Sequence, residues 1–373
     1  MAATVIEALR RFLPALRQSA PPLSADQRRA LKAITRCRTA ALGGQAFACA
    51  DCGRVRFAWH SCNHKACPQC GRADTARWIA REMKKLLPVP YFLVTFTLPA
   101  QLRGEFFGPQ AKAAYDLLFQ GAARALIEKL ATDKGLRAAV NGFTAVLHTW
   151  NQRLEFHPHI HCLVPGAGLN AQGRFVRVNH PNRLMHLEHL QAAFRQQCYR
   201  LFKAANWQVD PAVWRTDWGV HIQPAGSGAA ALKYLGTYVT RTAISDGRLI
   251  NVTDTHVTFR WQDRQHHRTE KLTLPGVEFV RRYLRHVLPK GLRSVRYYGF
   301  CHPRAQAKRL RVQLESGMAV QLGAELADTP AAAPPLCPDC RRPMRLLGSV
   351  RPHGHSRAPP LRFWNLPLPR PAA

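Results

Sequence analysis

The stretch FHPHIHCLVPG, from Phe156 to Gly166, carries three histidines at alternate positions, His157, His159 and His161. Apolar residues surround the histidines, and the run ends in Val-Pro-Gly. This pattern predicts a β-strand that leads into a turn. Because side chains alternate between the two faces of a strand, all three imidazoles are expected to leave the same face.

A strand face made of imidazoles has two explanations. One or two of the rings bind a metal ion, which gives neutral histidines a reason to gather. Alternatively, the face is a polar, exposed side of an edge strand, a position that suits Pro158. The rest of the chain has to distinguish the two.

The charge of the chain points to its partner. The 373 residues include 54 Lys and Arg against 22 Asp and Glu, a net charge of +32. Such an excess repels itself unless a polyanion is bound, so nucleic acid is the expected partner and an anionic membrane surface the alternative. No run of 18 apolar residues exists, and arginines interrupt the apolar N-terminus. We therefore expect no membrane association, and a cytoplasmic protein held at the nucleoid by DNA.

The 11 cysteines are expected to be metal ligands or buried thiols in a reducing compartment. Cys49 and Cys52 form one Cys-x-x-Cys-Gly turn, Cys67 and Cys70 form another, and 14 residues separate the two. Four thiolates so spaced predict a closed, structural Zn²⁺ site. Cys62 could replace one of the four, or a second ion could bind.

The roles of three other cysteines stay open at this stage. Cys37 lies close to the cysteine block, and Cys337 and Cys340 form a lone Cys-x-x-Cys pair with His353 and His355 downstream. A second, small zinc knuckle is one interpretation of that pair.

The order of the predicted elements indicates the fold class. Strands are expected at residues 91–98, 143–150 and 156–166, with a long helix at 111–131 after the first. The second and third strands are close enough to form a hairpin, and a matching register would bring His148 near the three histidines. The fold is therefore expected to be α+β, with an antiparallel sheet flanked by helices.

A second informative segment is AAALKYLGTYVTRT, residues 229–242, which is predicted to be a helix. Tyr234 and Tyr238 are four residues apart and so share one helix face, with Arg241 about one turn further on. Taken alone, such a pair is more often a packing feature than a catalytic one.

Together, the histidine strand, the tyrosine helix, the cysteine turns and the basic surface suggest strand transfer on single-stranded DNA. A tyrosine hydroxyl, with a pKa near 10, is a poor nucleophile at neutral pH. A divalent ion held by histidines can orient a scissile phosphate and neutralise its charge. Attack would give a phosphotyrosine and a 3′-hydroxyl, and two tyrosines allow two successive cuts, with Arg241 steadying a phosphate.

The motifs resemble those of a known family. His159-Ile160-His161 is a His-hydrophobic-His (HUH) triplet, and the segment from Tyr234 to Tyr238 resembles a paired-tyrosine motif. With CRTAALGG, FTLPAQLR, LHTW and HVLPKG, which span residues 30 to 300 or so, the chain resembles the insertion sequence 91 family of rolling-circle transposases.

The resemblance implies a fold, an activity and site residues. It implies an HUH-endonuclease-like sheet preceded by a zinc-binding domain, and nicking and rejoining of single-stranded DNA at insertion-sequence ends. His159 and His161 would bind catalytic Mg²⁺ or Mn²⁺, and Tyr234 and Tyr238 would be the nucleophiles. No motif identifies the third metal ligand, for which the candidates are His148 and Gln223, followed by His157 and His221.

On this basis three regions are expected. Residues 1–88 would form a helical and zinc-ribbon DNA-binding domain, residues 89–304 the two-tyrosine catalytic domain, and residues 305–373 a basic, partly disordered tail with room for a knuckle. A replication initiator or relaxase would share the tyrosine chemistry, although no phosphate-binding loop motif is present. A non-enzymatic zinc-dependent DNA-binding regulator is the alternative from another class. The oligomeric state and the DNA sequences recognised cannot be predicted from these patterns.

Overall fold

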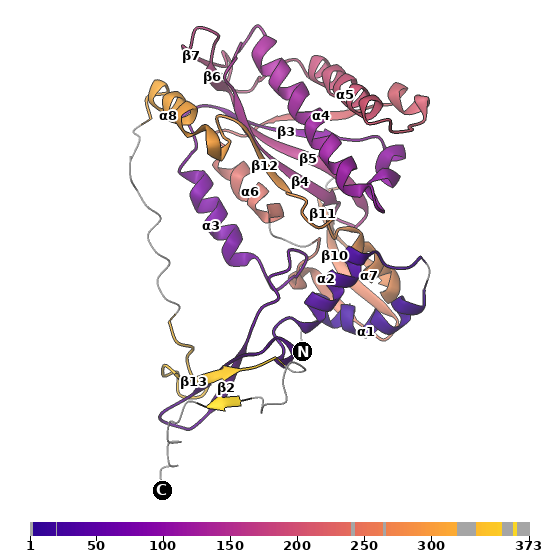
Figure 1. Ribbon diagram of the computed structural model, residues 1–373, viewed down its shortest axis with the longest axis vertical. Coiled ribbons are helices and arrows are strands. Elements are labelled where there is room, and N and C mark those ends of the chain that lie inside the picture. Colours follow the sequence, from indigo (N-terminus) through magenta and orange to yellow (C-terminus); the bar gives the residue numbers. More distant parts are fainter. Residues whose placement is uncertain are drawn as a thin grey trace.

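A five-stranded antiparallel sheet lies between helices in the upper part of the view in Figure 1. The computed structural model describes residues 3–19, 21–239, 243–263, 266–318, 333–352 and 361–363. The strands follow the order β12-β4-β5-β3-β8, with bounds Val295–Gly299, Gly142–Trp150, Phe156–Pro165, Tyr91–Thr97 and Gly219–Pro224. The predicted antiparallel α+β arrangement is confirmed.

The histidine strand β5 lies in the interior of this sheet, between β4 and β3. The prediction of a strand is confirmed, but the alternative that placed it at an edge is wrong. Pro158 is accommodated by irregular pairing instead. The register with β4 shifts between His148 and Trp150, and the pairing with β3 ends at His159. Pro158 therefore sits where a missing N–H breaks no regular ladder.

The two faces of the sheet are covered differently (Figure 1). Helices α4, Ala111–Thr132, and α5, Leu187–Ala204, pack on one face in the largest apolar core. Helix α6, Ala229–Val239, packs on the other face with α3, Arg72–Met83. Because α6 covers only part of its face, the histidines on that side border an open cavity.

A second core joins the N-terminus to a segment more than 240 residues away. Helices α1, Val5–Gln18, and α2, Ala25–Arg36, pack against a three-stranded sheet and helix α7, Gly276–Arg285. The sheet consists of β9, Leu249–Val252, β10, His256–Asp263, and β11, Arg268–Pro275. The expected boundary at residue 88 thus differs from the structure, because α1 and α2 share their core with residues 243–284.

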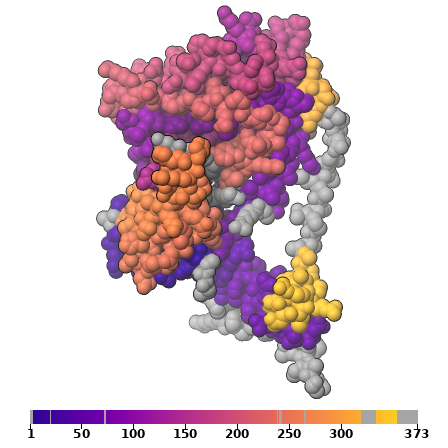
Figure 2. All heavy atoms as spheres, turned by 180° about the vertical axis from the view of Figure 1, so that it is seen from behind, coloured from indigo at the N-terminus to yellow at the C-terminus, as the bar shows by residue number. Residues whose placement is uncertain are grey.

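Two segments far apart in the sequence, residues 44–59 and 345–363, meet in a small third sheet, ordered β14-β13-β1-β2. Its strands are Leu361–Phe363, Arg345–Val350, Gly44–Ala48 and Val55–Trp59. Figure 2 shows the yellow C-terminal segment lying against the purple N-terminal one. Residues 305–373 were expected to form a basic, partly disordered tail with a possible zinc knuckle, and within them β13 is instead an ordered strand that pairs along β1.

The remaining elements are short. They are the hairpin β6–β7, Ala167–Leu169 and Phe175–Arg177, helix α8, Gln306–Glu315, and the 3₁₀ turns Ala40–Leu42, Ala100–Phe106, Pro211–Arg215, Asp246–Arg248 and Pro303–Ala305. In the part of the chain that the structure describes, none of the helices has the length and apolarity needed to span a bilayer.

The close approach of α7 to α1 supports a stability prediction. A Cβ added at Gly276 would lie 2.1 Å from ring atoms of the buried Phe12. Gly276→Ala is therefore expected to lower the free energy of unfolding by about 1–3 kcal/mol, the usual cost of overpacking, measured by chemical denaturation. Gly104→Ala is the matched control, because nothing lies within 4 Å of a Cβ there. Equal unfolding midpoints for the two variants would contradict the shared core.

Candidate functional site

Three imidazoles converge on one point of the central sheet. His148 on β4 pairs directly with His159 on β5, and His161 is the next residue on the same face of β5. His159 Nε2 lies 2.9 Å from His148 Nδ1 and 3.1 Å from His161 Nε2. All three rings are buried, and their ligand atoms lie within 4.8 Å of one another.

The outer nitrogens of the two β5 rings are held by the sheet. His159 Nδ1 lies 2.6 Å from the backbone carbonyl of His157, so Nδ1 carries the proton and donates it. That tautomer leaves a lone pair on Nε2, the form a metal ligand needs. His161 Nδ1 is similarly positioned, 2.9 Å from Thr95 Oγ1. The sheet therefore orients Nε2 of both residues toward the centre of the cluster.

The spacing of these nitrogens fits a metal ion. Two nitrogens that each bind one ion at about 2.1 Å, at roughly right angles, are about 3.0 Å apart. Burial, followed by the neighbouring imidazoles, lowers the pKa of His148 well below its usual value. The ring is therefore neutral at pH 7, as coordination requires.

The other histidine of the strand has a different partner. His157 Nδ1 lies 2.8 Å from the Arg103 guanidinium, and burial, then the Arg103 charge, lowers its pKa. His157 therefore lies on the same face as the three-histidine cluster without being part of it. The structure brings together His148, His159 and His161.

His221 and Gln223 lie on the edge strand β8, on the same face of the sheet. His221 is separated from His161 by Thr95 of β3, which pairs with both. Both β8 residues line the cavity next to the histidine cluster, and this cavity has a volume of about 990 Å³. The structure thus places Gln223 at the cavity two strands away from β5, and His148 directly in the cluster.

Helix α6 brings a tyrosine to the cluster. Tyr234 lines the cavity, with its ring centroid 5.9 Å from that of His161. Other residues of α6 pack against neighbouring elements. Leu235 is fully buried, and a Cβ at Gly236 would lie 2.6 Å from Ile79 of α3. The helix is therefore fixed with Tyr234 facing the histidines.

Tyr238 and Arg241 were predicted on the same helix face as Tyr234. Tyr238 lies in α6, one turn beyond Tyr234. Its side chain, and the whole of Arg241, lie outside the described residues.

Part of the lining of the cavity is aromatic and basic. Trp150, Arg153 and Trp261 line it, and the Arg153 guanidinium lies 5.4 Å from the centre of the Trp261 ring. Flat rings and cationic groups in one groove are the features that bind bases and phosphates of a single strand.

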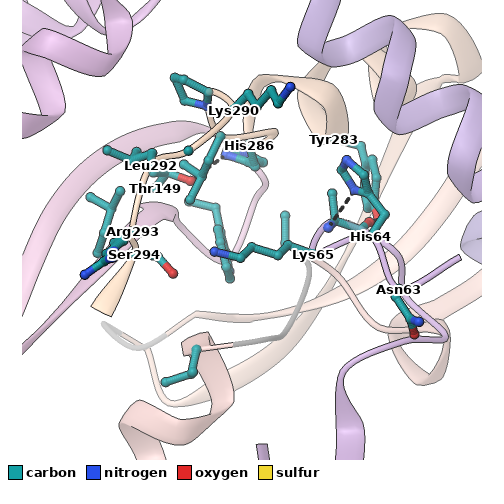
Figure 3. A pocket seen from close by; sticks show the side chains of 18 residues that line it. Asn63, His64, Lys65, Thr149, Tyr283, His286, Lys290, Leu292, Arg293 and Ser294 are labelled. Carbon is teal, nitrogen blue, oxygen red and sulfur yellow. Dashed lines mark hydrogen bonds between the residues drawn. The ribbon is translucent and has the colours of Figure 1, made fainter. Parts of the chain in front are cut away.

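A second hollow, of about 530 Å³, lies beyond Trp150, which lines both cavities. Figure 3 shows Lys65 reaching it from one loop, and Lys290 and Arg293 from another. All three side chains are exposed. The buried His286 lies at its inner wall, 3.3 Å from Thr149 Oγ1, and burial lowers its pKa to about 4. The positive charge of this hollow therefore comes from its exposed lysines and arginine.

The predicted zinc set of Cys49, Cys52, Cys67 and Cys70 is wrong in its grouping. The structure assigns the two pairs to separate clusters, one of Cys37, Cys62, Cys67 and Cys70 and one of Cys49, Cys52, Cys337 and Cys340. The physical reason is strand β2, which lies between the two Cys-x-x-Cys turns. Because β2 pairs antiparallel with β1, it returns the chain to the start of β1, where Cys70 lies 3.7 Å from Cys37 at the end of α2. His353 and His355 lie outside the described residues.

The first cluster fits a structural zinc ion. Cys70 Sγ lies 3.7 Å from Cys37 Sγ and 3.8 Å from Cys62 Sγ. Four sulfurs arranged tetrahedrally at about 2.3 Å from zinc are about 3.8 Å apart. The backbone N–H of Cys62 also lies 3.4 Å from Cys37 Sγ, an interaction that stabilises a thiolate. On sequence grounds Cys62 is only an alternative ligand and the role of Cys37 stays open, because neither belongs to a Cys-x-x-Cys pair.

Comparisons with known families match both parts of this structure. Residues 142–309, which hold the histidine cluster and the tyrosine helix, match the family described as "Putative transposase". Residues 8–98, which hold the first cysteine cluster, match the family described as "Transposase zinc-binding domain".

Two relatives are similar over most of the chain. "Putative transposase y4qJ" of Sinorhizobium fredii is 38% identical over 329 residues, 82% of each chain. "Transposase for insertion sequence element IS801" of Pseudomonas savastanoi pv. phaseolicola is 28% identical over 282 residues, 71% of this chain and 67% of the relative. No solved structure matches this chain. With its matching zinc-binding and transposase regions, the chain belongs to the insertion sequence 91 family of transposases, enzymes that cut and transfer DNA.

Proposed function

We propose that this transposase nicks and rejoins single-stranded DNA at insertion-sequence ends through 5′-phosphotyrosine intermediates, and so drives rolling-circle transposition. The observation that carries the proposal is the position of Tyr234 beside three convergent imidazoles in one aromatic and basic cavity. Neither the tyrosine nor the imidazoles alone would indicate this chemistry.

The proposed reaction is an in-line displacement at phosphorus. A tyrosine hydroxyl oxygen, from Tyr234 or Tyr238, attacks the scissile phosphate while the bond from phosphorus to the 3′-oxygen breaks. The hydroxyl proton passes to water, and the leaving 3′-oxygen takes a proton from water. Mg²⁺ or Mn²⁺ held by His148, His159 and His161 would neutralise charge on the phosphate oxygens. Because the phosphodiester energy remains in the covalent link, rejoining requires no ATP.

The tyrosines are tested by trapping the covalent adduct. A Tyr234→Phe/Tyr238→Phe variant is expected to form no adduct with a single-stranded oligonucleotide carrying the element's end, because both nucleophilic oxygens are gone. The measurement is the mass of the protein after incubation with Mg²⁺ or Mn²⁺. Tyr199→Phe is the matched control, since Tyr199 is exposed on α5 across the sheet.

An adduct that persists in the double variant would refute the tyrosine mechanism, while the single variants reveal the order of use. A replication initiator or relaxase would also form the adduct, so the oligonucleotide is compared with one lacking the element's end. A non-enzymatic regulator would bind the same DNA and form no adduct in any variant.

His148 is tested as the third metal ligand by comparison with two other polar residues of the same cavity. His148→Ala is expected to raise the Mn²⁺ concentration needed for half-maximal cleavage by about 10-fold or more, because one of three ligands is lost. His221→Ala and Gln223→Ala are the controls, as both residues line the cavity from β8. A larger shift for Gln223→Ala than for His148→Ala would reassign the third ligand.

The second hollow is proposed to continue the path of the bound strand past Trp150. Lys65→Ala/Lys290→Ala is expected to weaken binding of single-stranded DNA and to reduce the slope of log affinity against log salt by up to about 1.4, or roughly 0.7 for each lost phosphate contact. The control, Lys134→Ala/Lys203→Ala, removes the same charge from the turn that follows α4 and from α5. Equal slopes for the two double variants would exclude this path.

A further inference from the structure

The second cysteine cluster is built from the two ends of the chain. Cys49 and Cys52 lie in the turn between β1 and β2, and Cys337 and Cys340 lie just before β13. The family match to a zinc-binding domain ends at residue 98. It therefore includes only half of this cluster.

The two Cys-x-x-Cys turns have the same backbone geometry. In each, the first cysteine's N–H donates to the carbonyl five residues later, and its carbonyl accepts from the N–H four residues later. These hydrogen bonds are Cys49 N to Arg54 O, 2.9 Å, Gly53 N to Cys49 O, 3.1 Å, Cys337 N to Arg342 O, 2.8 Å, and Arg341 N to Cys337 O, 3.0 Å. Gly53 and Arg341 both have positive φ, 70° and 60°. The non-glycine residue Arg341 therefore takes the left-handed conformation that Gly53 adopts in the matching turn.

The sulfur atoms are spaced for a metal ion. Cys52 Sγ lies 3.7 Å from Cys337 Sγ, and all four sulfurs lie within 4.8 Å of one another. This agrees with the separation of about 3.8 Å in a tetrahedral zinc–thiolate site. It is far longer than the S–S bond of about 2.05 Å in a disulfide.

The apolar groups around the four cysteines are small. Among the described residues, Phe47 and Met344 join Cys49 and Cys337 in one small buried group. A second small group on β1 and β13 consists of Ala46, Ala48, Leu347 and Val350. Apolar groups of this size do not stabilise a fold by themselves. Two further contacts cross between the turns, Arg54 with Asp339 and Arg342 with Asp51, both 3.8 Å. All four charged side chains are exposed, so these pairs contribute little.

We infer that a second structural Zn²⁺, bound by Cys49, Cys52, Cys337 and Cys340, closes a zinc ribbon from both ends of the chain. A closed four-thiolate site stabilises a small domain through metal binding instead of through a large core. The antiparallel pairing of β13 with β1, from Gly44 opposite Val350 to Ala48 opposite Arg345, is the strand contact that this ion would hold.

The inference is tested by counting zinc in the purified full chain by mass spectrometry. The parent carries His159→Ala and His161→Ala, so that the histidine cluster adds no zinc. It is expected to hold about two zinc ions. Cys337→Ser/Cys340→Ser and Cys49→Ser/Cys52→Ser should each hold about one, and the variant with all four substitutions should also hold about one, because the two turns share an ion.

The control Cys301→Ser should keep both ions, since Cys301 belongs to neither cluster. X-ray absorption of zinc in the parent gives a readout that does not depend on folding of the variants, and should show sulfur ligands alone at about 2.3 Å. A parent with one zinc ion, an unchanged count in Cys337→Ser/Cys340→Ser, or nitrogen ligands in the parent would overturn the inference. A further loss in the four-substitution variant would mean that the turns bind separate ions.

Discussion

The register between β4 and β5 is the constraint on which the candidate site depends. It places His148 opposite His159 on the face toward α6, while Leu147 and Ile160 pack in the core beneath α4 and α5. A slip by one residue would exchange these faces. The burial of the apolar partners therefore specifies the register, and the register in turn assembles the imidazole cluster.

Electrostatics distinguishes the imidazole cluster from its surroundings. Burial keeps the His148 ring neutral. The positive groups lie around this cluster, with Arg153 at the cavity and Lys65, Lys290 and Arg293 at the second hollow. Neutral ligands remain available to a metal ion, while the surrounding cations attract the DNA backbone.

The cysteine clusters connect distant parts of the chain. The first adds Cys37 and Cys67 to the core that α1 and α2 share with α7. The second joins the N-terminal ribbon to β13. The N-terminal region thus makes two separate attachments, one to residues 243–284 and one to residues 337–350. A domain boundary drawn from sequence order alone does not capture either of them.

Local patterns in the sequence determined the elements and the chemistry they carry. The alternation of His157, His159 and His161 required a strand with one imidazole face, and the four-residue spacing of Tyr234 and Tyr238 placed both on one side of a helix. Strand and helix periods depend only on neighbouring residues, so they can be read directly from the chain.

The tertiary structure decided which of these residues meet. His148 joins His159 through strand pairing, and Cys52 meets Cys337 across 285 positions in the sequence. The sequence left several candidates for the third metal ligand and predicted a different grouping of the cysteines. Spacing along a chain does not measure distance across a fold. Register, the packing of α6, and the path of the chain between β1 and β13 are set by burial of apolar side chains far apart in sequence.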